Sequence, residues 1–314
     1  MNIVFIGSSK FSHRCLSVCL EFKDLCVTGL VTSPKKFSIS YSASRVKNVL
    51  HSNLLKFAAE RGIGVCSIDR SMNEPKIFNE IAKWKPDAFL VVGWYHMIPK
   101  SWRDLAPAYG LHASLLPDYS GGAPLVWAMI NGEVKTGITM FKMDDGVDSG
   151  PIIGQVEEKI FPEDTISTLY DRIEERGIEL LKEILPQLAC GKLKLRPQDE
   201  LNRRIMPQRS PKDGLIDWTK DSSFVDRFIR AQTKPYPGAF TTFNDKPLHI
   251  WKSTVSTKDL LKPPGSITKF NDRNYHVTCG NGSIILEEIS YDKSTFSKDQ
   301  LDDVFGSVDH ILGR

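Results

Sequence analysis

The distribution of apolar residues predicts alternating strands and helices over the first 190 residues. Ile3–Ile6 is a short apolar run that ends at Gly7, and Ala88–Val92 is a longer run that ends at Gly93. Runs of this length are typical of buried strands, and segments of helical spacing lie between them. Further strands are expected over 25–31, 65–68, 136–143 and 154–160, and helices over 53–61, 75–84 and about 162–190.

This alternation predicts an α/β domain with a mostly parallel sheet and helices on both of its faces. Functional loops are then expected at the carboxyl ends of the strands. Ser12 is expected to cap the first helix. A basic, serine-rich stretch over 35–48 has no periodicity and is interpreted as a surface loop.

The pattern changes after Gly191. Residues 192–211 are charged and irregular, which is typical of a linker. Short β-rich runs with turn signals follow, so we predict a small β domain and divide the chain into residues 1–205 and 206–314. Its expected strands are 238–243, 248–255, 267–270, 275–279 and 284–289, with helices over 222–232 and 298–305.

Composition narrows the classes of protein to which the chain can belong. Hydrophobic residues make up 41% and charged residues 25%, as in a soluble globular protein. The net charge of +3 is too small to imply a nucleic-acid partner by itself. Six cysteines form no CxxC pair and no zinc spacing, so we expect no metal. Without a signal peptide or a long apolar run, a cytoplasmic location is expected.

Candidate chemistry is concentrated between Gly110 and Gly150. His112 and Asp148 lie at the two ends of this block, each within a turn marked by glycine or proline. A lone histidine is by default a hydrogen-bonded structural residue. It is a general acid or base if a carboxylate orients it, and Asp148 supplies one if the two strands are neighbours.

Three other segments have both a structural and a functional interpretation. The turn from Gly7 to Lys10 is an ordinary connection or a phosphate-binding helix start. Gly93–Pro99, rich in aromatic residues, packs under a loop or contacts a flat heterocycle. Lys234–Phe240 shapes a domain interface or closes over a substrate.

The His112 block, the Gly122-Ala123-Pro124 segment and the Asp148-Ser149-Gly150 turn together resemble the folate-dependent formyltransferases. The resemblance covers most of the chain. It implies a Rossmann-like catalytic domain followed by an OB-like domain, to which the Pro235–Phe240 turn is similar. It also implies that a primary amine attacks the formyl carbon of N10-formyltetrahydrofolate.

The resemblance assigns roles to individual residues. His112 would take the amine proton, and Asp148 would orient that histidine. The folate co-substrate would contact Trp94, Tyr95, His96, Met97, Ile98, Asp145 and Val147. The acceptor would contact Ser8, Ser9, Lys10, Ser114, Tyr119, Gly121, Gly122, Arg209 and Tyr236.

Gly110 departs from the family, which normally places an asparagine two residues before the histidine. Such an oxyanion donor is worth roughly 10²–10³ in rate. The sequence leaves three explanations. A backbone N–H or a water molecule replaces the asparagine donor, or a side chain from the Tyr95-His96 loop replaces it. In the third, the protein is slow, altered or inactive as a formyltransferase. The intact residues around His112 favour compensation.

The acceptor is predicted from charge and from two local segments. Between Arg209 and Arg314 there are 15 Lys and Arg against 14 Asp and Glu, which gives tRNA no basic excess. The predicted acceptor is a nucleotide-linked amino sugar of lipopolysaccharide precursor synthesis. This charge count favours it, and so do two segments, Tyr119–Trp127 and Tyr236–Phe240. We therefore expect a homodimeric sugar N-formyltransferase with no nucleic-acid and no membrane partner. The alternatives are a methionyl-tRNA formyltransferase and a catalytically impaired homologue that binds folate or a nucleotide sugar.

Overall fold

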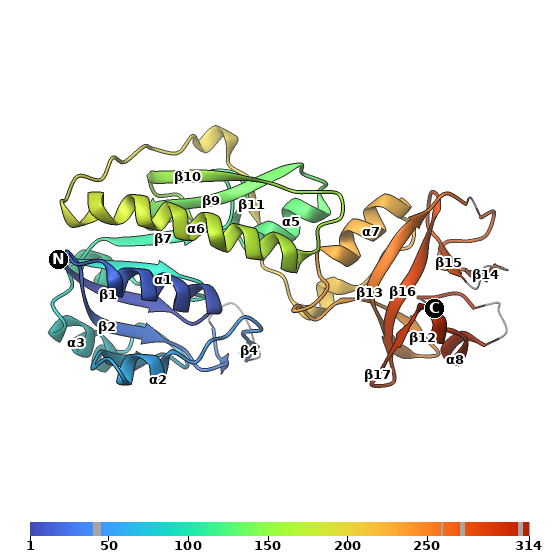
Figure 1. Ribbon diagram of the computed structural model, residues 1–314, viewed down its shortest axis with the longest axis horizontal. Coiled ribbons are helices and arrows are strands. Elements are labelled where there is room, and N and C mark those ends of the chain that lie inside the picture. Colours follow the sequence, from blue (N-terminus) through green and yellow to red (C-terminus); the bar gives the residue numbers. More distant parts are fainter. Residues whose placement is uncertain (40–44, 259, 271–273, 307–309, 314) are drawn as a thin grey trace. The chain divides into compact units, whose positions relative to one another are not determined.

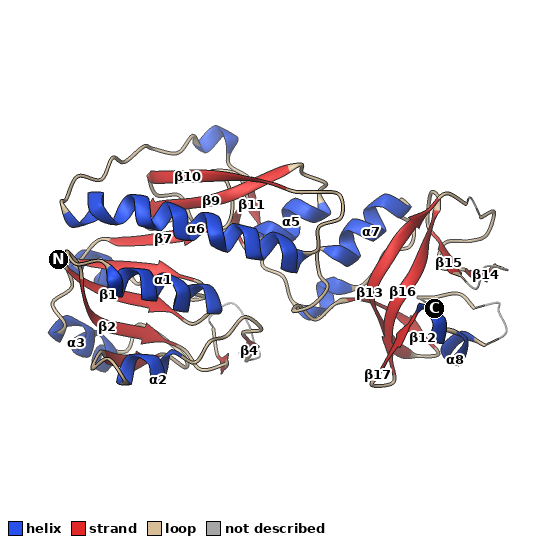
Figure 2. Cartoon of the chain, viewed as in Figure 1, coloured by secondary structure: helices blue, strands red, loops and turns tan. Residues whose placement is uncertain are grey.

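The computed structural model describes residues 1–39, 45–258, 260–270, 274–306 and 310–313. The chain divides into two compact units. The first contains residues 1–121, 136–159 and 171–205, and the second contains 122–135, 160–170 and 206–314. Figure 1 shows the elements in chain order, and Figure 2 shows that helices accompany the sheet of the first unit.

A seven-stranded sheet forms the first unit, in the order β10-β9-β7-β6-β1-β2-β5. The pairs from β7 to β5 are parallel, whereas β9 runs antiparallel to β7. The strands are β1 Asn2–Gly7, β2 Cys26–Thr32, β5 Gly64–Ser67, β6 Ala88–Val92, β7 Ala108–His112, β9 Lys135–Lys142 and β10 Ile152–Lys159. The predicted mostly parallel sheet is confirmed.

Successive side chains of the central strands point to opposite faces of this sheet, and the side chains on both faces are buried. Val4 and Val91 pack with Ile81 of α3 and Trp102 of α4 on one face. On β1, Phe5 points to the opposite face and is also fully buried. The helices of this region are α1 Lys10–Glu21, α2 Leu54–Ala59, α3 Pro75–Lys83, α4 Lys100–Leu105 and α6 Ile166–Ala189.

The first helix begins earlier than predicted. Ser9, not Ser12, is the N-cap residue, and its side chain accepts a hydrogen bond from the Ser12 backbone. The Ser9 backbone N–H in turn donates to the Ser12 hydroxyl, which completes a capping box. The sequence alone does not tell which serine is the N-cap residue, because the hydroxyl of either can accept from the free backbone N–H groups at a helix start.

Several short elements were not predicted. The stretch 35–48 contains a two-stranded ladder of β3 Lys36–Phe37 and β4 Val46–Lys47. Residues 40–44 of that predicted loop lie outside the described residues. The helix α4, the strand β7, the helix α5 Pro124–Ile130 and the short pair of β8 Ser120–Gly121 with β11 Ile205–Met206 were also missed.

The second unit is built on an antiparallel sheet in the order β12-β13-β16-β15-β14, with β17 paired to β16. Val225 and Ile229 of the helix α7 pack on Leu248 and Ile250 of this sheet. A separate C-terminal β unit is therefore confirmed. Its elements are α7 Ser222–Arg230, β12 Ala239–Phe243, β13 Lys246–Ser256, β14 Ile267–Lys269, β15 Tyr275–Thr278, β16 Ser283–Tyr291, β17 Ser294–Ser297 and α8 Asp302–Phe305.

Single-turn 3₁₀ helices complete the described structure, at Glu200–Asn202, Pro211–Gly214 and Lys298–Gln300. The last of them precedes α8, so the predicted terminal helix over 298–305 is broken into two turns. Among the helices of the described ranges, none is long and apolar enough to cross a membrane.

A stability test follows from the packing of Trp84 on β2. A β-carbon at Gly29 would lie 2.0 Å from the nearest ring carbon of Trp84. We expect Gly29→Ala to lower the free energy of unfolding by about 1–3 kcal/mol, because the ring must move within a packed core. Urea denaturation measures the change. The loss should shrink when Trp84→Leu is present in the background, and an unchanged midpoint in the single variant would contradict this packing.

Candidate active site

His112 is the last residue of β7, and the structure holds its ring at both nitrogens. Nε2 lies 2.8 Å from the backbone oxygen of Tyr119. A carbonyl oxygen can only accept, so Nε2 donates the proton in this bond. The His112 side chain is only 11% exposed, so it is fixed in a largely dry position.

Asp148 reaches the other side of the imidazole. Its Oδ2 lies 3.5 Å from His112 Nδ1 and accepts a hydrogen bond of 2.8 Å from the Gly121 backbone. Asp148 has a φ of 52°, in the left-handed region, which turns its side chain back toward β7. The structure thus brings together the two residues that the sequence selected.

The loop that carries Asp148, residues 143–150, lies along β7. It begins beside the start of that strand, where the Met143 backbone donates to Ala108 O at 2.8 Å. Gln198 holds its far end, because Nε2 of Gln198 donates to the backbone oxygens of Asp148 at 2.8 Å and Gly150 at 2.6 Å. The loop therefore runs from Ala108 toward His112 with both of its ends tied down.

Gly110 faces Met143. A β-carbon at Gly110 would lie 2.5 Å from the Met143 Cε and 3.3 Å from a ring carbon of Phe141. The methyl group of Met143 therefore fills the space that a side chain at position 110 would take.

The loop after β6 holds the residues predicted for the folate. Gly93 turns it with a φ of 57°. Tyr95 and His96 both pack against the ring of Phe37, and Tyr95 OH donates to Asn48 Oδ1 at 3.2 Å. Burial lowers the pKa of His96, which favours its neutral form.

The remaining folate candidates differ in exposure. The Trp94 indole donates to Met72 Sδ at 3.3 Å, which fixes the ring over the core. Ile98 is buried. Met97 and Val147 expose 57% and 42% of their surfaces, so both are open to a ligand.

Arg103 of α4 joins the two loops predicted to hold the folate. Its Nε donates to Ile98 O at 3.2 Å, and its Nη2 pairs with Asp145 Oδ1 at 2.5 Å. The hydrogen bond from Arg103 holds the pKa of Asp145 below its usual range. No sequence pattern points to Arg103, because the short helix that presents it is not predicted.

The predicted phosphate turn at the end of β1 is occupied by protein contacts. Ser8 is fully buried, and Asn48 Nδ2 contacts its backbone oxygen at 3.2 Å. The Ser9 hydroxyl lies 2.8 Å from that of Ser12, which donates to Val92 O. Of the three candidates, only the Lys10 side chain is exposed.

The acceptor candidates after His112 shape its loop. Ser114 is fully buried, and its hydroxyl donates to Asp118 O at 2.7 Å. Tyr119 has a φ of 54°, which aims its backbone oxygen at His112, and Gly121 donates its N–H to Asp148. These residues position the pair of His112 and Asp148.

Gly122, Arg209 and Tyr236 belong to the second unit. Arg209 lies 4.6 Å over the Trp127 ring and donates to Gln232 Oε1 at 2.6 Å. Burial lowers the pKa of its guanidinium. Tyr236 OH lies 3.0 Å from Tyr170 OH, and the Gly122 backbone donates to Met206 O. All three have contacts within their own unit.

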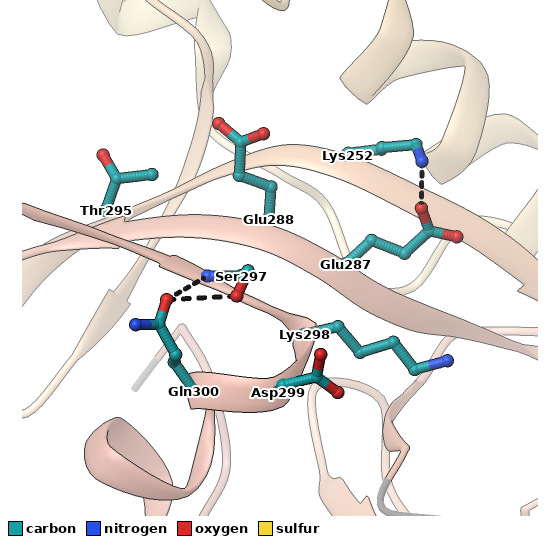
Figure 3. A pocket seen from close by; sticks show the side chains of 8 residues that line it. All are labelled: Lys252, Glu287, Glu288, Thr295, Ser297, Lys298, Asp299 and Gln300. Carbon is teal, nitrogen blue, oxygen red and sulfur yellow. Dashed lines mark hydrogen bonds and ion pairs between the residues drawn. The ribbon is translucent and has the colours of Figure 1, made fainter.

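Figure 3 shows a surface groove of the second unit, of about 560 Å³. Two of its lining residues, Lys252 and Glu287, form an ion pair at 2.6 Å. None of the predicted site residues lines this groove. Within the described ranges, no group of three or more histidine, cysteine or acidic side chains is arranged to hold a metal ion.

Comparison with known families matches both units. The family described as formyl transferase matches residues 1–185, and the formyl transferase C-terminal domain matches residues 209–301. The methionyl-tRNA formyltransferase of Citrifermentans bemidjiense is 33% identical over 292 residues, which are 92% of this chain and 88% of that protein. Further relatives of the same name are 31–34% identical.

Solved structures share the fold. The N-formyltransferase from Helicobacter canadensis, solved with folinic acid and dTDP-3-aminofucose, has a TM-score of 0.67 and 20% identity, over 90% of this chain and 98% of its own. HypX from Aquifex aeolicus has a TM-score of 0.64 and 18% identity, over 98% of this chain but only 48% of its own.

These relatives contradict the prediction of a sugar N-formyltransferase. Proteins above 30% identity over nine tenths of the chain carry the other name, whereas the N-formyltransferase solved with dTDP-3-aminofucose is 20% identical and shows the fold alone. The error has a physical source. A charge count summed over residues 209–314 says nothing of how the charges are distributed on a surface, and short aromatic turns are compatible with either acceptor.

The Arg103–Asp145 pair yields a titration test. A carboxyl whose pKa is lowered keeps its ion pair at neutral pH and loses it only as the pH falls through that lowered pKa. We expect Arg103→Gln to raise the pKa of Asp145 toward the ordinary value of about 3.9. Carbon-detected NMR of the Asp145 carboxyl measures it. Lys100→Gln, a weaker influence on Asp145, should shift it less. Identical titration in wild type and Arg103→Gln would contradict the assignment.

Proposed function

The chain belongs to the formyl transferase family, and from that premise we propose that it formylates the amino group of methionyl-tRNA. Membership confirms the predicted N-formyltransferase activity and N10-formyltetrahydrofolate as the formyl donor. The observation that carries the choice of acceptor is the 33% identity, over 92% of the chain, to a methionyl-tRNA formyltransferase.

In the proposed reaction, the methionyl amine attacks the formyl carbon and one amine proton passes to His112. The tetrahedral intermediate then breaks its bond to N10 of the folate, which leaves with a proton returned by the imidazolium. The products are formylmethionyl-tRNA and tetrahydrofolate. Nε2 donates to Tyr119 O in this structure, so the ring must exchange that bond for the substrate before it can accept a proton.

Asp148 supports this role of His112 by its position at Nδ1. A carboxylate there stabilises the imidazolium that forms during the transfer. Since Gly110 has no side chain and Met143 covers it, we assign stabilisation of the developing oxyanion to the protonated His112.

A transfer assay tests the acceptor. With radiolabelled N10-formyltetrahydrofolate, wild-type protein should formylate methionyl-tRNA but neither free methionine nor uncharged tRNA. Raising the salt concentration should raise the KM for the tRNA, because phosphate contacts are screened. If the protein binds tetrahydrofolate but transfers no formyl group, the proposal is wrong and the protein is a catalytically impaired homologue. A higher kcat/KM with nucleotide amino sugars would also overturn it.

Substitutions test the catalytic assignment. We expect His112→Asn to lower kcat by about 10²–10⁴-fold, because the proton acceptor is lost, and Asp148→Asn to lower it by a smaller factor. Calorimetric binding of tetrahydrofolate should be nearly unchanged in both variants. His13→Asn and Asp104→Asn are matched controls, since His13 packs on Phe57 and Asp104 pairs with Lys100. Turnover that survives His112→Asn would exclude this histidine as the base.

A further inference from the structure

Asp148 holds its carboxylate beside His112 from a strained backbone. Its φ of 52° lies in the left-handed region, which a residue with a side chain keeps only when neighbouring contacts hold it there. The two rotations at Asp148, φ and ψ, set the angles between the planar peptide groups on either side of its Cα. The contacts that hold these two peptide groups therefore decide where the carboxylate points.

Two side chains of one short segment hold the two peptide groups. The Val147 oxygen, which belongs to the peptide group before the Asp148 Cα, accepts a hydrogen bond from Arg203 Nη2. The Asp148 oxygen, in the peptide group after that Cα, accepts from Gln198 Nε2 at 2.8 Å. The same nitrogen donates to Gly150 O at 2.6 Å. A side-chain amide nitrogen carries two hydrogens, so Gln198 uses both of its donors on this loop.

The Arg203 side chain is itself held in place. It is only 14% exposed, and its Nη1 pairs with Glu200 at 3.0 Å. Glu200 begins a 3₁₀ turn that Asp199 caps, because the Asp199 side chain accepts from Leu201 N at 3.1 Å. Hydrogen bonds from a charged donor are stronger than those between neutral groups. The guanidinium therefore grips the loop from a position fixed by its own segment.

The same segment contacts the residue that accepts the hydrogen bond of His112. Tyr119 O and Ser120 N belong to one peptide group, which is trans. The oxygen accepts from His112 Nε2 at 2.8 Å, and the N–H donates to Arg204 O at 3.0 Å. The C=O and N–H of a trans peptide point in opposite directions, so Arg204 O fixes the plane of this peptide group from its far side. The segment thus reaches both members of the pair of His112 and Asp148.

We propose that Gln198 and Arg203 are positioning residues for catalysis, which hold Asp148 in its left-handed conformation and so place its carboxylate beside His112. The role in catalysis rests on the proposed function. The bonds to the loop end on backbone oxygens, so the two residues act through Asp148 and not on the substrates. Part of the stretch 192–211, predicted from the sequence as a linker, then belongs to the active site.

Steady-state kinetics of Gln198→Met, Arg203→Met and Arg203→Lys test this role. Methionine removes the donors and keeps much of the side-chain volume. We expect either methionine variant to lower kcat about tenfold with both KM values nearly unchanged, because the carboxylate shifts from the imidazole by a fraction of an ångström. Arg203→Lys keeps a charged donor and should be faster than Arg203→Met. Gln187→Met and Arg14→Met are matched controls, since both side chains have their partners on α6.

A background of Asp148→Asn separates positioning from a general loss of structure. Gln198→Met should lower kcat much less in this background, because the carboxylate that Gln198 positions is already gone. An equal loss in both backgrounds would show that Gln198 acts independently of Asp148, and would overturn the proposal. A raised KM at unchanged kcat in the single variant would also overturn it.

Hydrogen exchange decides the positioning role even if the wild type transfers no formyl group, in which case the proposed function fails by itself. The Gly121 amide donates to Asp148 Oδ2. The Ser120 amide, which donates to Arg204 O, is the internal reference. In Gln198→Met we expect the Gly121 amide to exchange about tenfold faster, and the Ser120 amide to keep its rate. Unchanged exchange at Gly121, or an equal rise at both amides, would overturn the positioning of Asp148 by Gln198.

Discussion

The antiparallel pairing of β9 with β7 is the constraint on which the candidate site depends. It sets Phe141 opposite Gly110 and Thr139 opposite His112, so the chain leaves β9 at the amino end of β7. The loop that follows must then return along β7 to reach the histidine. Its contacts with Ala108, Gly110 and the Gly121 backbone follow that path. Reversing β9 would place the start of this loop at the opposite end of the strand.

The sequence predicted the chemical pair better than its surroundings. His112 and Asp148 stood out because each lies in a turn of glycine and proline within a recognisable block, and the structure places them 3.5 Å apart. The direction of β9 carries no local sequence signal, so the approach of Met143 to Gly110 could not be predicted. Gln198 was missed for a similar reason, since it acts through backbone oxygens of a loop far away in the sequence. Arg103 was missed because the short helix that carries it is not predicted.

The fold shows a related division. Long apolar runs such as Ala88–Val92 predicted their strands, because burial on both faces leaves a continuous hydrophobic signature. The strand β7 escaped notice because alanine and glycine dilute its pattern, and α4 and α5 are too short to show helical periodicity. Ser8 and Ser9 illustrate the limit of a turn signal, because the same hydroxyls that could bind phosphate instead cap α1 and hold the chain around Asn48.

The close approach of Met143 to Gly110 has a consequence for how this sequence can evolve. The nearest atom that a side chain at position 110 would meet is the methyl end of Met143, the most movable part of that residue. A change of rotamer at position 143 therefore accommodates a substitution at Gly110. Selection can alter position 110 without first altering position 143, so this glycine can be gained or lost in a single step.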